Sequence, residues 1–213
     1  MYAKEIWQIP DLDPKNWGGY NVSPDGKVSE ELLASQMKAK PANTRAPESF
    51  LADGLRVLNT HAKNKLGIKL LKEHESIPEL LKKTHRFRAL DRTGLFSLAK
   101  DMARITADSL DVASIQTIVQ PPKNIKWGSL KSLEHLISIK VGPEVARSIL
   151  SRFFGVYELR HGDAHLPSSQ INEALTLIGI DQSLPYIYQG YQLLHACVSS
   201  IFSIADILSK WDE

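Results

Sequence analysis

Residues 143–160 read PEVARSILSRFFGVYELR, and this stretch indicates the type of fold. Large apolar residues recur in it at offsets of four, four and three positions, the spacing that puts side chains on one face of an α-helix. They are Val145, Ile149, Phe153 and Val156. Pro143 and Glu144 suit the first helical turn, because the N–H that proline lacks is unused there and an acidic side chain complements the helix dipole. The stretch therefore predicts an amphipathic helix whose apolar stripe lies on a core.

Similar apolar spacings run outward from this helix in both directions, and no run alternates convincingly in the manner of a strand. The predicted fold class is all-α, a helical bundle. Further helices are expected at residues 29–39, 47–64, 76–85, 91–118 and 129–139, with Asp91 as the N-cap of the fourth. A final long helix begins near Leu184 and is apolar on two faces. We expect it to pack on the core and on a second subunit.

The N-terminal part of the chain differs in composition from the rest. Residues 1–28 are rich in Pro, Asp, Gly and Asn and have no helical or strand periodicity, which predicts an irregular arm. Trp7 and Trp17 are expected to hold this arm against the body, since large aromatic side chains are usually buried. We divide the chain into this arm, an N-terminal helical segment at 29–90 and a helical domain at 91–213.

Composition excludes several classes of protein. The chain has 213 residues and is 43% hydrophobic and 23% charged, values near the globular average that exclude a disordered or collagen-like chain. Its one cysteine, Cys197, excludes a disulfide scaffold and a cysteine-based zinc site. The first residues show no secretory signal, and the apolar run Leu193–Leu208 is shorter than the roughly 20 residues that cross a bilayer. We predict a cytoplasmic protein with no membrane partner.

Basic residues gather in one part of the chain. Residues 31–92 contain 13 Lys or Arg against 7 Asp or Glu, a net charge of +6, although the whole chain carries only +2. Such a segment can follow the phosphate backbone of a nucleic acid. It can equally be a solvated helical surface, and both interpretations stay open.

The amphipathic helix leads directly into a polar segment. Residues 157–165 read YELRHGDAH, and Arg160 continues the apolar stripe by one further helical turn. An arginine on a buried face needs an acidic partner or an anionic ligand, because its charge is costly to bury alone. Gly162 allows the helix to end, so that His165 can fold back toward Arg160. A histidine that exchanges protons near neutral pH, beside an arginine that holds phosphate, suits phosphodiester cleavage without a metal.

Arg160, His161 and His165 resemble the arginine, the polar residue and the histidine of the Arg-polar-x(3–5)-His motif of the HEPN superfamily. The resemblance covers residues 91–211, as the helices that flank the motif. It implies an all-helical, HEPN-like domain that dimerises to form one cleft from two motifs and needs no metal or other cofactor. Many members are ribonucleases of toxin–antitoxin, phage-defence or CRISPR-associated systems. The implied partners are RNA, a second copy of the chain and an antitoxin or defence-system protein.

The resemblance also implies a role for each motif residue. In an endoribonuclease of this type, the 2′-hydroxyl of RNA attacks the adjacent phosphate. His165 is expected to act as general acid or base, and Arg160 to stabilise the charge that develops on the phosphate. His161 is expected to position these groups.

Three observations support other interpretations of the motif. Arg56 and His61 show the same spacing, although Arg56 lies one turn after Asp53 on a polar helix face. The string from His161 to His165 also reads His-x-Asp-x-His, whose side chains can bind a divalent metal. Short motifs of this kind also arise by chance.

Two further interpretations do not involve catalysis. The loop around Trp127 can form a peptide-binding surface or anchor the start of a helix in the core. Arg160 can form a structural ion pair, in which case the chain is a non-catalytic helical module for dimerisation or for binding RNA or a protein.

Overall fold

The computed structural model describes residues 33–39, 45–72, 74–160 and 167–212. The chain divides into two compact units, Met1–Thr44 and Arg45–Glu213, which are treated separately. The described residues of the first unit contain a π-helical segment, η1 at Leu33–Met37, within the helix expected at 29–39. The expected arm at 1–28, with Trp7 and Trp17, lies outside the described residues.

The described part of the second unit is helical, which confirms the all-α class. Most of the expected helices are present, with ends that differ by a few residues. Its elements are η2 Pro47–Phe50, α4 Leu51–Leu66, α5 Ile77–Lys83, η3 Arg86–Arg88, α6 Arg92–Ile105, α7 Val112–Gln116, α8 Ser129–Val141, α9 Pro143–Leu159, α10 Ser168–Ile178 and α11 Tyr186–Ser209.

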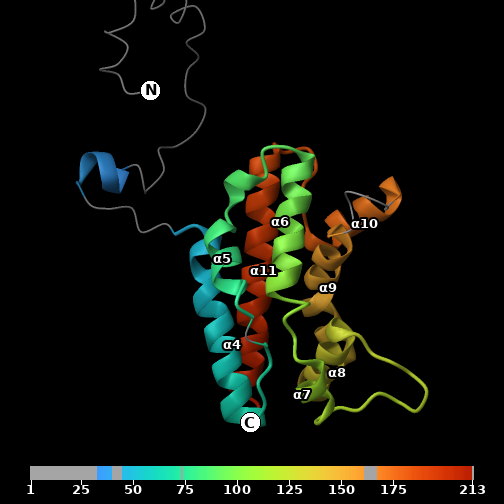
Figure 1. Ribbon diagram of the computed structural model, residues 1–213. Coiled ribbons are helices and arrows are strands. Elements are labelled where there is room, and N and C mark those ends of the chain that lie inside the picture. Colours follow the sequence, from blue (N-terminus) through green and yellow to red (C-terminus); the bar gives the residue numbers. More distant parts are fainter. Residues whose placement is uncertain (1–32, 40–44, 73, 161–166, 213) are drawn as a thin grey trace, which may run out of the picture. The chain divides into compact units, whose positions relative to one another are not determined.

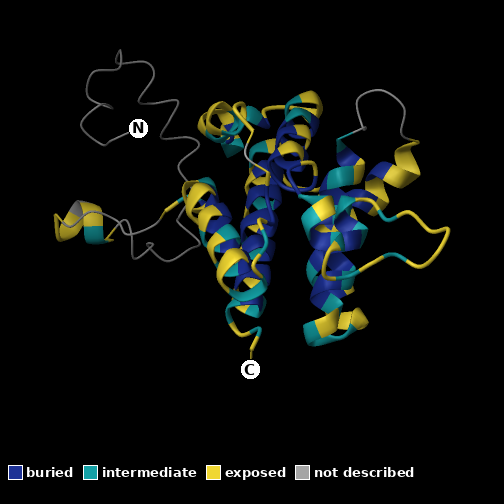
Figure 2. Cartoon of the chain, turned by 60° about the horizontal axis from the view of Figure 1, so that its bottom comes forward, coloured by how far each residue is buried: buried dark blue, intermediate teal, exposed yellow. Residues whose placement is uncertain are grey.

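Helix α11 forms the centre of this unit and packs against α4, α6 and α9 (Figure 1). Buried residues line its length and the facing sides of the neighbouring helices (Figure 2). The two apolar faces of α11 therefore find partners within the chain itself. One of these faces carries Tyr191, Val198 and Phe202, of which Tyr191 and Phe202 stay 40% and 37% exposed.

Helix α11 is also long and apolar enough to cross a membrane by length and composition. More than half of its most apolar window, 56%, is buried inside the protein. A core helix of a soluble protein has the same properties, so the length of α11 does not by itself indicate a membrane span.

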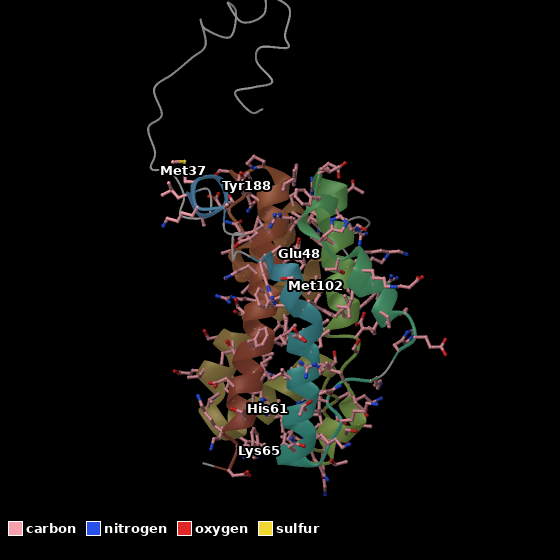
Figure 3. All side chains as sticks on the ribbon, turned by 90° about the vertical axis from the view of Figure 1, so that its left-hand side faces the viewer. Met37, Glu48, His61, Lys65, Met102 and Tyr188 are labelled. Atoms are coloured by element: carbon pink, nitrogen blue, oxygen red, sulfur yellow. The ribbon has the colours of Figure 1, made fainter. Side chains whose placement is uncertain are left out.

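Polar contacts hold the ends of α4 and α11 together. Gly67 ends α4 in the left-handed conformation, with φ of 68°. Lys65, one turn beyond His61 near this end (Figure 3), places its Nζ 2.7 Å from Oδ2 of Asp212. The Nζ of Lys140 on α8 donates to the carbonyl oxygen of Trp211 at 3.2 Å. Residues just beyond α11 are thus bonded to both α4 and α8.

The expected helix at 91–118 begins as predicted but is shorter. Asp91 caps α6, and its Oδ1 accepts a hydrogen bond of 2.7 Å from the N–H of Gly94. The prediction is wrong beyond Ile105, where α6 ends. There the Oγ1 of Thr106 donates to the carbonyl oxygen of Met102 at 2.7 Å.

The chain after α6 pairs with an extended segment instead of continuing the helix. The N–H of Lys72 donates to the carbonyl oxygen of Ser109 at 2.7 Å, and the N–H of Asp111 donates to that of Leu70 at 2.8 Å. Asp111 then caps α7, because its Oδ1 accepts from the backbone N–H of Ser114 at 3.4 Å and its Oδ2 accepts from the Oγ of Ser114 at 2.7 Å. These bonds to residues 70–72 satisfy backbone groups that a longer helix would have paired internally.

The apolar stripe predicted for α9 is confirmed in part. Phe153 and Val156 are buried, but Val145 is 50% exposed, so the prediction is wrong at the start of the helix. The buried face instead follows positions spaced by three or four residues from the second turn on. Those positions are Ala146, Leu150, Phe153, Val156 and Leu159. With this face buried, α9 packs against α6, α8, α10 and α11.

Candidate functional site

Arg160 is the C-cap of α9, so it lies at the helix end as expected. Its backbone is still helical, with φ of −58° and ψ of −22°, and its N–H donates to the carbonyl oxygen of Val156 at 3.3 Å. The side chain is 23% exposed. The guanidinium therefore lies at the boundary between the core face of α9 and solvent.

Among the described residues, two side chains contact the guanidinium of Arg160. Its Nη1 lies 2.7 Å from Oδ1 of Asp108, in the segment that follows α6. Its Nη2 donates to Oη of Tyr157 at 2.9 Å, and its Cζ lies 3.9 Å from the centre of the Tyr157 ring. Asp108 is thus an acidic partner of Arg160 within the described part of the chain, and Tyr157 supports the arginine from one helical turn earlier.

The Asp108 carboxylate is open to water. Its side chain is 41% exposed, compared with 11% for Asp101, which forms the more buried ion pair with Arg88. An exposed ion pair stabilises a folded protein by at most about 1 kcal/mol, because water solvates both charges before they meet. The Arg160–Asp108 pair therefore orients the guanidinium more than it stabilises the fold.

The other two predicted site residues, His161 and His165, lie outside the described residues. The His-x-Asp-x-His string that suggested a metal lies there as well. Within the described ranges, no group of three or more His, Cys, Asp or Glu side chains could hold a metal ion.

Cys197 is fully buried on α11, and burial raises the pKa of its thiol to about 12. It is a small apolar residue of the core.

The second Arg–His pair in the sequence differs from the motif in its surroundings. Arg56 forms its ion pair with Asp53 on the same helix, with 3.1 Å between Nη2 and Oδ1, and its side chain is 71% exposed.

Trp127 is half-buried and stacks on His135, with 3.8 Å between ring centres. It anchors the start of α8 through this contact.

A cleft beside Asp108 was not expected from the sequence. One cavity of about 360 Å³ is lined by Asp108 and Arg104 together with Lys72 and His74. A second, of about 400 Å³, is lined by Arg56 and apolar side chains of α4, α5 and α6. The two cavities adjoin because they share four lining residues: Lys72, His74, Ile77 and Ser109. Together they form what we call the basic cleft, whose charged or titratable lining residues are Arg56, Lys72, His74, Glu75, Arg104 and Asp108.

The sequence contained one signal for this cleft. Four of its six charged or titratable lining residues, Arg56, Lys72, His74 and Glu75, lie within residues 31–92, the segment with the net charge of +6. Arg104 and Asp108 come from the far end of α6 and from the segment after it. The pairing of residues 70–72 with residues 109–111, together with the packing of α5 and η3 against α6, brings these two parts of the chain together.

Comparisons of the chain with protein-family models, with curated proteins and with solved structures found no match. The resemblance to the HEPN superfamily therefore rests on the motif at Arg160 and on the helix that carries it.

Proposed function

We propose that this chain is a metal-independent endoribonuclease of the HEPN type. Arg160, His161 and His165 are its site, and RNA is its substrate. A toxin–antitoxin or phage-defence system in the cytoplasm is the setting that the resemblance suggests, with an antitoxin or defence-system protein as a further partner.

The observation that carries this proposal is the environment of Arg160. Its guanidinium lies at the end of a core helix, is oriented by Tyr157 and Asp108, and is 23% exposed. Such an arrangement preorganises a donor for an anion, because the side chain is held in place while its partner carboxylate remains accessible to water. A phosphate can replace Asp108 at modest cost in stability, since the exposed pair is worth at most about 1 kcal/mol.

The proposed reaction moves one proton onto and one off the RNA. The 2′-oxygen attacks the adjacent phosphorus and loses its proton to a base. The bond from phosphorus to the 5′-oxygen of the next nucleotide breaks, and that oxygen takes a proton from an acid. His165 supplies one of these proton transfers, and Arg160 stabilises the negative charge on the phosphate oxygens. The products are a 2′,3′-cyclic phosphate and a 5′-hydroxyl.

The chemistry of the new ends tests this mechanism. We expect the purified full chain to cut labelled total RNA in EDTA and to leave 5′-hydroxyl ends, which polynucleotide kinase labels directly. Ends that carry a 5′-phosphate, or cleavage that stops in EDTA, would contradict attack by the 2′-hydroxyl.

The second candidate function is a non-catalytic helical module, and the ion pair itself favours it. Arg160 already has a carboxylate partner 2.7 Å away, as a purely structural arginine would. In this case the chain dimerises or binds RNA or a protein, and Arg160 only fixes α9 to the segment after α6.

A homodimer is part of the proposal, because the motif of one subunit is completed by the motif of the other. The described part of α11 still exposes Tyr188 by 61% and Tyr191 by 40%, which leaves aromatic surface for a second copy. We expect a dimer in analytical ultracentrifugation at tens of micromolar. A monomer at these concentrations would contradict a site shared between two subunits.

A further inference from the structure

The basic cleft continues from the Arg160–Asp108 pair toward α4. Asp108 lines its near end, where it binds Arg160 through its Oδ1. Lys72 and His74 lie in the middle, because they line both cavities. Arg56 lies at the far end. A ligand in the cleft can therefore extend from α4 to the end of α9.

The charges along the cleft favour an anionic ligand. Its described lining residues include three permanent cations, Arg56, Lys72 and Arg104, and two carboxylates, Glu75 and Asp108. Arg56 is already paired with Asp53, so Lys72 and Arg104 are the cations available to a ligand. Asp108 is already bound to Arg160, which adds a fourth cation at the near end. Arg104 reaches its acidic neighbour Asp101 only at 3.6 Å and is half exposed, so it can turn toward a ligand.

The far cavity differs from the near one because its walls are mainly apolar. Leu55 from α4, Ile77 and Pro78 from α5 and Ile105 from α6 line it. A flat ring can lie among such side chains while charged groups stay at the rim. Phosphates linked to a ring that fits an apolar pocket are the chemistry of a nucleotide.

We infer that the basic cleft binds an unpaired segment of RNA, with one base in the far cavity and the adjacent phosphates on Lys72 and Arg104. The inference rests on the proposed function, since it supplies the path by which the substrate reaches Arg160. The cleft is expected to favour single-stranded RNA, because a base inside a duplex is stacked and paired and cannot enter a side cavity. The cleft lies outside the motif and acts in binding alone.

The test measures RNA binding in the full-length His165→Ala chain, so that cleavage does not remove the probe. The probe is a fluorescent single-stranded RNA of mixed sequence, followed by anisotropy over a range of salt concentrations. Lys72→Glu/Arg104→Glu is expected to weaken binding by about tenfold or more. The slope of log K against log salt is expected to fall by about 0.7 for each phosphate that the protein no longer neutralises.

A matched control changes the same charges elsewhere. Lys123 and Lys126 are exposed residues of the segment before α8 and line neither cavity. Lys123→Glu/Lys126→Glu is expected to change the affinity less than about twofold. Equal loss in both double variants would overturn the inference, because it would show that only the overall charge matters. Circular dichroism on both variants confirms that the fold is retained.

Two further probes test the far cavity. An abasic oligonucleotide of the same length is expected to bind more weakly than the RNA, and a duplex RNA more weakly still. Equal binding of the abasic strand would overturn the placement of a base in the cavity.

The inference and the proposed function fail separately. If the chain cleaves RNA and Lys72→Glu/Arg104→Glu leaves binding unchanged, the cleft is not the substrate path and the inference is wrong. If the cleft variants lose binding but no preparation cleaves RNA, the cleft binds RNA as inferred and the nuclease proposal is wrong.

Discussion

Arg160→Ala and His165→Ala are each expected to slow RNA cleavage by about 100-fold or more. The first removes the donor that stabilises charge on the phosphate, and the second removes a proton-transfer group. Neither change is expected to disturb the fold much. The Arg160–Asp108 pair is exposed enough that its loss costs at most about 1 kcal/mol, or roughly 2–4 °C in Tm for a chain of this size.

Arg160→Lys separates charge from geometry at the same position. Lysine retains the positive charge, but its single ammonium cannot make the two parallel hydrogen bonds that a guanidinium makes to phosphate oxygens. It also cannot bind Asp108 and Tyr157 at once in the manner of Arg160. We therefore expect Arg160→Lys to be damaging as well. His161→Ala is expected to have a smaller effect.

Asp108→Asn shows whether Arg160 is only structural. If the arginine acts only in its ion pair, Arg160→Ala and Asp108→Asn lower Tm by similar amounts, and the double variant adds nothing to either. In that case the parent protein does not cleave RNA and His165→Ala is nearly silent. Those results together would contradict the nuclease proposal and support the non-catalytic module instead.

Gly155→Val is expected to destabilise the fold strongly. A Cβ at this position of α9 would lie 2.6 Å from the carbonyl oxygen of Ala174 and 2.8 Å from Cγ1 of Ile178, both on α10. The first of these neighbours is a backbone atom, which cannot move without shifting the whole helix. We expect a loss of about 3 kcal/mol in the free energy of unfolding, measured by urea denaturation.

A solvent-facing position on the same helix is the control for this substitution. Ser148 is exposed, so Ser148→Val introduces the same side chain without the close approach to α10. It is expected to change the free energy of unfolding by less than about 0.5 kcal/mol. Equal effects of the two substitutions would show that valine is unfavourable in α9 for reasons other than packing against α10.

The helices were predictable where local chemistry and periodicity agree. Asp91 caps α6 as expected, and α11 begins at Tyr186, close to the start predicted near Leu184. Helix α10, at residues 168–178, was not predicted, although Ile171, Ala174, Leu175 and Ile178 are buried in it at helical spacing. The end of α6 at Ile105 was not predictable, since it depends on bonds between residues 70–72 and 109–111.

The candidate site was predictable only in its local part. The helical spacing places Arg160 at the end of α9, and the sequence shows that such an arginine needs a partner. It cannot show that the partner is Asp108, because the two residues are 52 positions apart and meet only when α6 packs against α9. The basic cleft depends in the same way on tertiary packing, although two of its cations, Arg56 and Lys72, contribute to the charge of residues 31–92.

The most direct measurement of the central claim is the rate at which the purified full chain shortens labelled total RNA in EDTA. The Arg160→Ala/His165→Ala chain, prepared in the same way and shown to be folded, is the control. The nuclease proposal predicts fragments from the parent chain and a rate at least about 100-fold lower from the double variant. Intact RNA with the parent chain, or equal rates with both chains, would contradict it.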